Sequence, residues 1–289
     1  MKLGINTCSI ERLMKKEMNA GNVESMIDPI SHIEHSLKLG FRHFEITCDI
    51  NFLFSDELNA HFINRLIALK KEHTLTYSVH LPFRGMELSY PCKEMSDAYA
   101  KLMVKVIKAL ELIQPEAYVI HAFGDLGKKF GKLGAESFMM KHMSGFSYYV
   151  LKKILDDSKI PSRKIAVENV KFPFIVLQSI IDELDLSICM DVGHILAGYS
   201  GEFTIKDFLN HNYDRIAEIH LHDAYKRSTP EGVMINDHIA LGEGDLDYKW
   251  LISDLHERGY NKRIIMEMKY DAQISSFGLL TKEFPDLWL

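Results

Sequence analysis

The sequence lacks several features that would assign it to a special class of protein. Its 289 residues include only four cysteines, Cys8, Cys48, Cys92 and Cys189. These are far apart and form no CxxC pair, so they are expected to be reduced thiols rather than a disulfide framework. No apolar run is long enough to cross a membrane, and the N-terminus has no long apolar signal segment. We therefore predict a cytoplasmic protein without a membrane partner.

An excess of basic residues is also absent. The chain has 34 Lys and Arg against 40 Asp and Glu, a formal net charge of −6. This balance excludes a broadly basic nucleic-acid surface, although a local basic cleft stays open. The composition, 47% hydrophobic and 26% charged, is that of an ordinary globular protein. A chain of this length can bury a large core without disulfides.

No low-complexity linker or shift in composition divides the chain, so residues 1–289 are predicted to form one domain. Strand-like apolar runs alternate with segments whose apolar residues recur at helical spacing. One such helical segment has Ile30, Ile33 and Leu37 on one stripe and ends at Gly40. The predicted strands span residues 2–6, 41–47, 75–80, 117–121, 164–169, 186–191, 216–222 and 263–268.

Eight strand–helix steps are typical of an α/β protein folded as a single closed (β/α)₈ TIM barrel. The competing fold, an open doubly wound sheet, needs a glycine-rich phosphate loop after the first strand, and NTCSIERL is not one. The glycines and lysines of residues 124–134 could touch a phosphate, but a solvated loop is the preferred interpretation.

Ionisable side chains recur at the carboxyl ends of the predicted strands, where TIM barrels carry their functional residues. The opposite ends carry Phe, Leu, Ala, Lys, Leu, Ile and Arg. At the carboxyl ends and the segments that follow them, the residues are Glu45, His80, His121, Glu168, Asp191 with His194, His220 with His222 and Asp223, and Glu267. A polar loop after the seventh strand adds His238. Because the ionisable residues gather at one end of the strands, they are expected to form a common site.

Each residue also has a simpler interpretation, because a single histidine at a strand end is usually structural. Asp191 and Asp223 could each cap the turn or helix that follows. Glu168 and Glu267, however, follow short apolar runs, which implies burial, and a buried carboxylate must be protonated, paired or bound to metal. Without a ring of Lys or Arg, a divalent cation is the simplest partner. A mixed His and carboxylate set suits zinc or manganese.

Seven short motifs occur in the order and at the spacing of a known superfamily. They are HLPF (80–83), VIH (119–121), AVEN (166–169), MDVGH (190–194), HLHD (220–223), DHIALGEG (237–244) and IIMEM (264–268). Together they resemble the xylose-isomerase-like, or AP-endonuclease family 2, TIM-barrel superfamily. The resemblance covers essentially the whole chain and leaves two branches open.

In the sugar isomerase and epimerase branch, the resemblance implies one metal ion held by Glu168, Asp191, His220 and Glu267. The metal polarises a sugar or polyol substrate, and the glutamates Glu168 and Glu267 move a proton through an enediolate. Barrels of this kind often form homodimers. The residues expected to contact the substrate are Glu45, Phe83, Arg84, His222 and Asp237.

In the endonuclease IV branch, additional ligands build a centre of up to three zinc ions that cleaves DNA beside an abasic site. The residues that match these ligands are His80, His121, His194 and His238, with Asn236 at the place of an aspartate. Phe83 and Arg84 fall where that branch inserts residues into DNA.

The isomerase or epimerase branch is favoured on two grounds. Glu45 resembles that branch, and the segment CDINFLFSDEL (48–58) has no basic residue for DNA. A nucleic-acid partner is expected only under the alternative. A third reading is a metal-binding barrel without turnover.

Overall fold

The computed structural model describes residues 1–7, 29–49, 58–170 and 172–288. Cys8 and most of the segment 48–58 lie outside the described residues. Among the residues described, Cys48, Cys92 and Cys189 are free thiols. No helix in the described ranges is long and apolar enough to cross a membrane.

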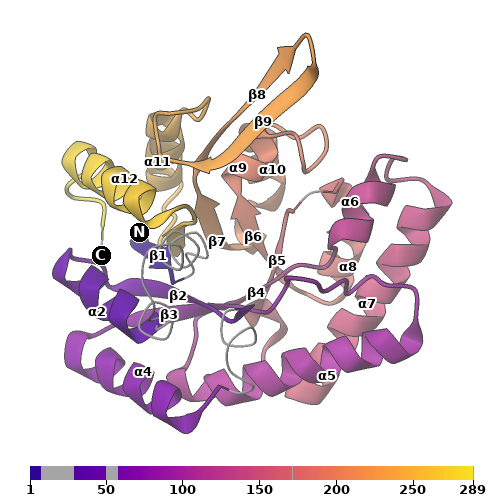
Figure 1. Cartoon of the computed structure of the whole chain (residues 1–289), viewed down its shortest axis with the longest axis horizontal. Helices are drawn as coiled ribbons and strands as arrows, with labels where there is room; N and C mark the ends of the chain where they lie inside the picture. Colours follow the sequence, from indigo (N-terminus) through magenta and orange to yellow (C-terminus); the bar gives the residue numbers. More distant parts are fainter. Residues whose placement is uncertain (8–28, 50–57, 171, 289) are drawn as a thin grey trace, which may run out of the picture.

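Eight parallel strands close into a barrel, as the sequence predicts (Figure 1). Their order around the barrel is β1-β10-β7-β6-β5-β4-β3-β2. Each predicted strand is confirmed within two residues at either end. The strands are β1 (Lys2–Asn6), β2 (His43–Thr47), β3 (Thr76–His80), β4 (Tyr118–Ile120), β5 (Ile165–Glu168), β6 (Ser187–Asp191), β7 (Ile216–Leu221) and β10 (Arg263–Met266).

Helices surround the barrel, and the two chain ends lie close together (Figure 1). The α-helices are α2 (Pro29–Lys38), α4 (Ala60–His73), α5 (Lys93–Leu110), α6 (Asp125–Gly131), α7 (Phe138–Ser158), α8 (Gln178–Glu183), α9 (Val192–Leu196), α10 (Ile205–Asn212), α11 (Tyr248–Glu257) and α12 (Tyr270–Glu283). Short 3₁₀ turns are η2 (Glu111–Ile113), η3 (Ser162–Lys164), η4 (Phe174–Leu177) and η5 (Tyr213–Arg215). The amino group of Met1 donates to the carbonyl of Leu287 at 2.9 Å. This bond ties the first strand to the C-terminal segment.

Two segments expected to be loops have regular structure instead. Residues 124–134 contain helix α6, because the Glu87 carboxylate accepts the N–H groups of Gly124, Leu126 and Gly127 at its start. That carboxylate occupies the helix end that a phosphate would need. The polar segment after the seventh strand is an antiparallel hairpin, β8 (Asp223–Thr229) and β9 (Gly232–Ile239), which projects from the barrel (Figure 1).

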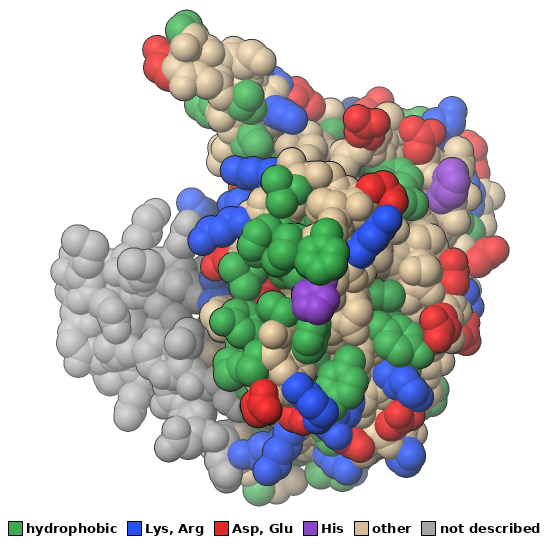
Figure 2. Space-filling view, turned by 90° about the vertical axis from the view of Figure 1, so that its right-hand side faces the viewer, with side chains coloured by type: hydrophobic (Ala, Val, Ile, Leu, Met, Phe, Trp, Pro, Cys, Tyr) green, Lys and Arg blue, Asp and Glu red, His purple; other side chains and the backbone are tan. Residues whose placement is uncertain are grey.

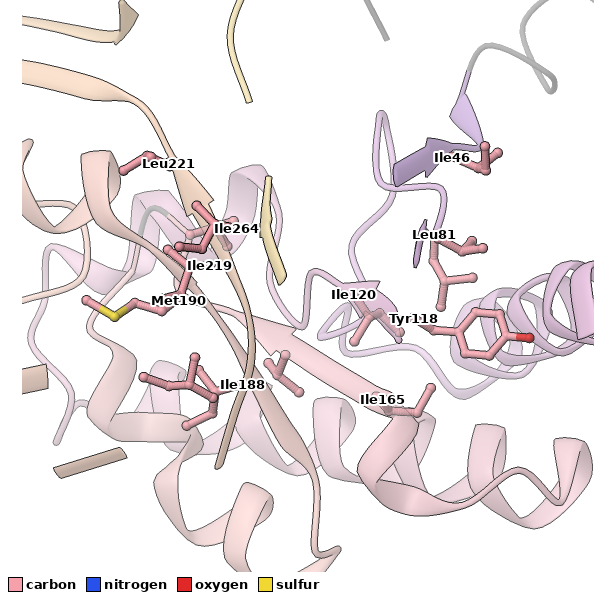
Figure 3. Close-up of a cluster of buried hydrophobic side chains, with 14 of the residues drawn as sticks. Ile46, Leu81, Tyr118, Ile120, Ile165, Ile188, Met190, Ile219, Leu221 and Ile264 are labelled. Atoms are coloured by element: carbon pink, nitrogen blue, oxygen red, sulfur yellow. The ribbon is translucent and has the colours of Figure 1, made fainter. Parts of the chain in front are cut away.

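Alternate residues of the barrel strands face the helices and form the hydrophobic core. Figure 3 shows this layer, with side chains from β2, β4, β5, β6, β7 and β10 lying between the strands and the helices. On β6 and β7 they include Ile188, Met190, Ile219 and Leu221, all completely buried. Tyr118 reaches α5, where its hydroxyl donates to the carbonyl of Ile107 at 3.3 Å.

The inward faces of the strands are polar, unlike the apolar filling that is usual in a TIM barrel. A separate small apolar cluster consists of Val119, Ala166, Cys189 and Ala217. Buried ionisable groups from β2, β7 and β10 also lie in the barrel interior. Arg263 donates to Glu218 at 2.9 Å, and Ser78 donates to the same carboxylate at 3.0 Å. Small side chains leave the space that these polar groups occupy.

One face of the molecule carries exposed hydrophobic side chains gathered around a histidine (Figure 2). The exposed apolar residues on and beside α6, α7 and η4 are Leu133, Phe138 and Ile175. On α7 the rings of Phe138, His142 and Phe146 lie in contact along one side of the helix. This surface lies outside the barrel strands, so it plays no part in the site described next.

Candidate metal centre

Four potential metal ligands meet at the carboxyl end of the barrel. They come from the ends of four strands: Glu168 from β5, Asp191 from β6, His220 from β7 and Glu267 from the residue after β10. One ligand atom from each lies within 4.8 Å of the others. We call these four residues the central cluster. The parallel strands bring their carboxyl ends to one rim, which is why residues far apart in the sequence converge.

His220 shows how the central cluster is oriented. Its Nε2 atom lies 3.1 Å from Glu45 Oε2, and its Nδ1 atom lies 2.8 Å from Glu267 Oε2 and 3.6 Å from Glu168 Oε2. Nδ1 makes no hydrogen bond, although the side chain is completely buried. A buried nitrogen that faces two carboxylates without a hydrogen bond is the arrangement a bound cation would complete.

Glu168 also belongs to a second group of ligands, formed with His80 and His121. The Nε2 atoms of the two histidines lie 3.2 Å and 2.9 Å from Glu168 Oε2. We call these three residues the His80 cluster, whose ligand atoms likewise lie within 4.8 Å of one another. Glu168 is therefore placed to be shared between two sites.

Asp191 joins the central cluster to a third group with His194, His222 and His238, which we call the hairpin cluster. Its carboxylate accepts the backbone N–H of His194 at 2.6 Å and so caps α9, as the simpler sequence interpretation expected. His222 Nε2 lies 3.0 Å from the same carboxylate. His194 Nδ1 is buried, makes no hydrogen bond and lies 3.5 Å from Glu168 Oε1.

The hairpin places Asn236, Asp237 and His238 differently from one another. His238 belongs to the hairpin cluster, with Nε2 4.0 Å from Glu267 Oε2. Asp237 is partly buried beside it. Asn236, expected among the additional ligands, is exposed on β9 opposite Tyr225. The hairpin cluster therefore forms without the expected residue Asn236.

Phe83 and Arg84 lie at the rim of the His80 cluster. The Phe83 ring packs against the rings of His80 and His121, with centroids 4.8 Å and 4.4 Å apart. Arg84 is exposed and lies over Phe83, and both backbone N–H groups donate to Asp49. Phe83 is partly exposed and Arg84 is exposed, so their contact with a substrate stays a prediction.

Glu45 and His222, which the sequence predicts as substrate contacts, lie against residues of the central cluster in the structure. Both side chains are completely buried, and each lies against one residue of the central cluster, Glu45 against His220 and His222 against Asp191. A group shielded on all sides by protein can orient a ligand more readily than it can contact a substrate.

The electrostatics of the site follow from opposite charges buried together. Burial alone would raise the pKa of Glu168, but the imidazoles of His121 and His220 outweigh it and hold that pKa well below its usual range. Burial would lower the pKa of His80, yet its bond to Glu168 and the nearby carboxylates raise it to about 10. The carboxylates therefore demand a positive partner, which protons on the histidines or a bound cation can supply.

Asn169 holds the backbone of Asp191 in place, although the sequence analysis does not single it out. Asn169 receives the backbone N–H of Asp191 at 2.7 Å and donates to the carbonyl of the same residue at 2.9 Å. Asp223 accepts four backbone N–H groups, those of Ala224, Gly242, Gly244 and Leu246. These bonds connect the HLHD motif (220–223) to the LGEG segment (241–244). Asp223 holds the turn, as the capping interpretation expected.

The donor set of the central cluster, three carboxylates and one imidazole, fits a divalent cation such as zinc or manganese. The buried nitrogen of His220 and the depressed pKa of Glu168 are consistent with that chemistry. The His80 cluster offers two imidazoles and one shared carboxylate for a second ion. The geometry can thus support Lewis-acid chemistry beside two glutamates.

Comparison with known proteins identifies a family model that matches most of this chain. A model of the xylose isomerase-like TIM barrel family matches residues 33–283. The chain is 25% identical over 273 residues to the uncharacterized protein MJ1311 of Methanocaldococcus jannaschii, and the match covers 89% of this chain and 85% of that protein.

Two solved structures share the fold. The crystal structure of a D-tagatose 3-epimerase-like protein has a TM-score of 0.71 and 19% identity, covering 99% of this chain and 97% of that one. Endonuclease IV from Thermus thermophilus has a TM-score of 0.69 and 16% identity, covering 99% and 100%. At these identities the likeness concerns the fold alone, so the barrel is common to proteins named for different activities.

Proposed function

The chain belongs to the xylose isomerase-like TIM barrel family, and we propose that it is a divalent-metal-dependent isomerase or epimerase of a sugar, sugar phosphate or polyol. The observation that carries the proposal is the central cluster, in which Glu168, Asp191, His220 and Glu267 present ligand atoms within 4.8 Å of one another. A solved relative of the same fold is described as D-tagatose 3-epimerase-like. The clustered side chains are buried or nearly so, which suits a small polyhydroxy substrate better than a polymer.

When bound at the central cluster, zinc or manganese would polarise a carbonyl or hydroxyl oxygen of the substrate. Glu168 and Glu267 then serve as the groups that remove and return a proton. Glu168 ends strand β5 and Glu267 directly follows strand β10, with β6 and β7 between these two strands in the barrel. Their carboxylates therefore approach the site from two directions, which a proton moving from one face of a carbon to the other requires.

The surrounding residues orient these groups and shape the entrance. Glu45 holds His220, with its carboxylate 3.1 Å from Nε2, so that Nδ1 stays directed toward the cation site. Phe83 covers His80 and His121 at the rim and can exclude water from the substrate. Arg84 is the exposed cation beside it and is suited to a phosphate or a hydroxyl group of the substrate.

Solvent deuterium exchange tests the proposal without knowledge of the product. The protein, loaded with manganese or zinc, is incubated in D₂O with a panel of ketoses and ketose phosphates, and NMR follows deuterium entering the carbon next to the carbonyl. We expect exchange with at least one compound, and its loss in Glu168→Gln and Glu267→Gln but not in Glu34→Gln. Exchange with no compound, or unchanged exchange in both variants, contradicts the proposal.

One observation favours a second candidate, a zinc phosphodiesterase acting on abasic-site DNA. The His80 cluster provides a second set of ligands that shares Glu168, and endonuclease IV has the same fold. Metal-dependent incision of a duplex with an abasic site, lost in His80→Gln, would establish this function instead. Metal binding with neither activity would indicate a barrel without turnover.

A further inference from the structure

We propose that His222 is a positioning residue whose tautomer is set by the β8–β9 hairpin, so that it holds Asp191 in the orientation a cation requires. This inference rests on the proposed function, because it takes Asp191 as a cation ligand. Two contacts carry it: His222 Nδ1 accepts the backbone N–H of His238, and His222 Nε2 faces the carboxylate of Asp191.

The backbone of His238 decides which nitrogen of His222 carries the proton. The N–H of His238 points at His222 Nδ1 at 2.9 Å. A peptide N–H can only donate, so Nδ1 must present a lone pair and the ring proton lies on Nε2. The carbonyl of Asp223, 3.2 Å from Nδ1, would be the acceptor in the other tautomer. The His238 N–H excludes that tautomer.

The protonated nitrogen faces the candidate ligand. Nε2 of His222 lies 3.0 Å from Asp191 Oδ2 and donates to it. The other side of the same carboxylate accepts the N–H of His194 at 2.6 Å. Asp191 is thus held by two donors, one from α9 and one from the residue that follows β7. A ring whose Nε2 proton is directed at a carboxylate supports that carboxylate and is not itself a metal ligand.

A bulge in the hairpin makes this arrangement possible. Asp223 pairs with Ile239 and Tyr225 pairs with Asn236, so the single residue Ala224 stands opposite Asp237 and His238. His238 adopts a left-handed backbone conformation, with φ of +56°. Bulges redirect backbone groups beside functional sites, and here the bulge turns an N–H from the ladder toward a buried imidazole. The cost of a left-handed non-glycine residue is offset by that contact.

Gly193 supplies the space in which the His222 ring lies. A Cβ atom at Gly193 would come within 2.0 Å of His222 Cε1 and 2.1 Å of Nδ1. No side chain larger than hydrogen fits there while the ring stays against Asp191. The ring also stacks on that of His238, with centroids 4.0 Å apart and planes 14° apart. Gly193, the glycine of the MDVGH motif, is therefore needed for His222 to lie against Asp191.

Zinc affinity and stoichiometry of the full chain test the assignment. We expect His222→Phe, which keeps the ring shape but not the donor, to bind zinc roughly 10- to 100-fold more weakly at unchanged stoichiometry. His222→Gln, which can still donate to Asp191, should recover most of the affinity, and Gly193→Ala should behave like His222→Phe. The matched control is His142→Phe on the α7 surface, which should bind as the parent protein does.

Each other outcome has a definite meaning. Unchanged affinity in His222→Phe, with binding abolished in Asp191→Asn, overturns the role of His222 and leaves the proposed function intact. A stoichiometry lower by one ion in His222→Phe overturns it too, because His222 would then be a ligand. If Asp191→Asn and Glu267→Gln bind zinc as the parent does, it is the proposed function that fails.

A measurement on the unmodified protein keeps the inference testable should a variant fail to fold. Long-range ¹H–¹⁵N NMR of histidine-labelled, chelator-treated protein distinguishes a protonated from an unprotonated ring nitrogen. We expect one buried histidine with protonated Nε2 and unprotonated Nδ1, coupled by an NOE to the amide proton of His238. A protonated Nδ1 at that histidine would overturn the assignment.

Discussion

At the scale of single residues, the site depends on groups that orient the ligands as much as on the ligands. Glu45 faces His220, His222 faces Asp191, and Asn169 bonds the backbone of Asp191 at both its N–H and its carbonyl. The first two contacts restrain side chains, and the Asn169 contacts restrain the backbone of Asp191. Precise orientation matters because a cation accepts ligands only within a narrow geometry.

Glu45→Gln tests one such contact. When ionised, the Glu45 carboxylate can only accept, so it keeps the proton of His220 on Nε2 and leaves Nδ1 for a cation. An amide can present a donor instead and reverse that tautomer. We expect zinc affinity to fall about tenfold or more, measured by competition with a chromogenic chelator. The exposed Glu34→Gln is the control, and equal affinity in both variants would show that Glu45 does not orient the ligand.

His43 makes a prediction about stability and pH. Its ring is buried between Thr76 and Ser78, and this burial lowers its pKa to about 4. The charges of Arg263 and Lys2 lower the pKa further, whereas those of Glu218 and Glu116 raise it. In the unfolded chain the pKa is near the ordinary 6.5, so the unfolded state takes up the proton first as the pH falls. The contribution of neutral His43 to the free energy of unfolding is therefore complete above about pH 6.5. It is lost as the pH falls from there to about 4.

At pH 5 this loss amounts to about 2 kcal/mol relative to pH 7. Urea unfolding of the parent protein and of His43→Gln, both with chelator, measures it at the two pH values. We expect the free energy of unfolding of His43→Gln to change with pH by about 2 kcal/mol less. An identical pH dependence in the two proteins would show that His43 is not held neutral.

At the scale of elements, the β8–β9 hairpin is the part of the fold that differs most from expectation. Its strands alternate in exposure only weakly, and its tip exposes Val233 and Met234. What holds its base is the Asp223 carboxylate, with four N–H donors from Ala224 to Leu246. The hairpin thus depends on one buried carboxylate more than on hydrophobic packing.

Asp223→Ala should therefore destabilise the protein strongly. Four backbone N–H groups would lose their acceptor, which we expect to lower the free energy of unfolding by roughly 3–5 kcal/mol. The control is Asp245→Ala, in the segment after the hairpin, which removes an exposed pair with Arg227 on β8 and should change little. Chemical unfolding compares the two, and similar small losses in both would refute the anchoring role.

At the scale of the whole molecule, the central cluster joins four neighbouring strands of the barrel. Its residues stand on β5, β6, β7 and the segment after β10, so a cation bound there would link parts of the chain that are distant in sequence. A ligand that binds only the folded state stabilises it by mass action. The polar barrel interior makes this linkage important, because buried carboxylates without a cation repel one another.

Removal of metal should consequently lower the melting temperature. Zinc at a free concentration about 100-fold above its Kd should add about 2.7 kcal/mol to the free energy of unfolding. Differential scanning calorimetry with zinc and with excess chelator measures the shift, and Glu267→Gln should show a smaller one. A melting temperature that zinc leaves unchanged in the parent protein would argue against a cation at the central cluster.

The homodimer, the single domain and the cytoplasmic location remain predictions. Sedimentation velocity would test the homodimer.

The sequence by itself determined the barrel and the rim. Apolar runs of period two and helical stripes are local patterns, so the eight strands were predictable, and the polarity of the strands indicated that Glu168, Asp191, His220 and Glu267 would meet. The sequence did not predict which of these side chains contact one another. Those contacts depend on the stagger of the strands and on bulges such as the one at Asp237 and His238. Only the tertiary structure placed Glu45 and His222 against His220 and Asp191, and showed that the segment predicted as a loop is the β8–β9 hairpin. Backbone direction and tautomer are decided by contacts between residues distant in sequence, and local composition carries no record of them.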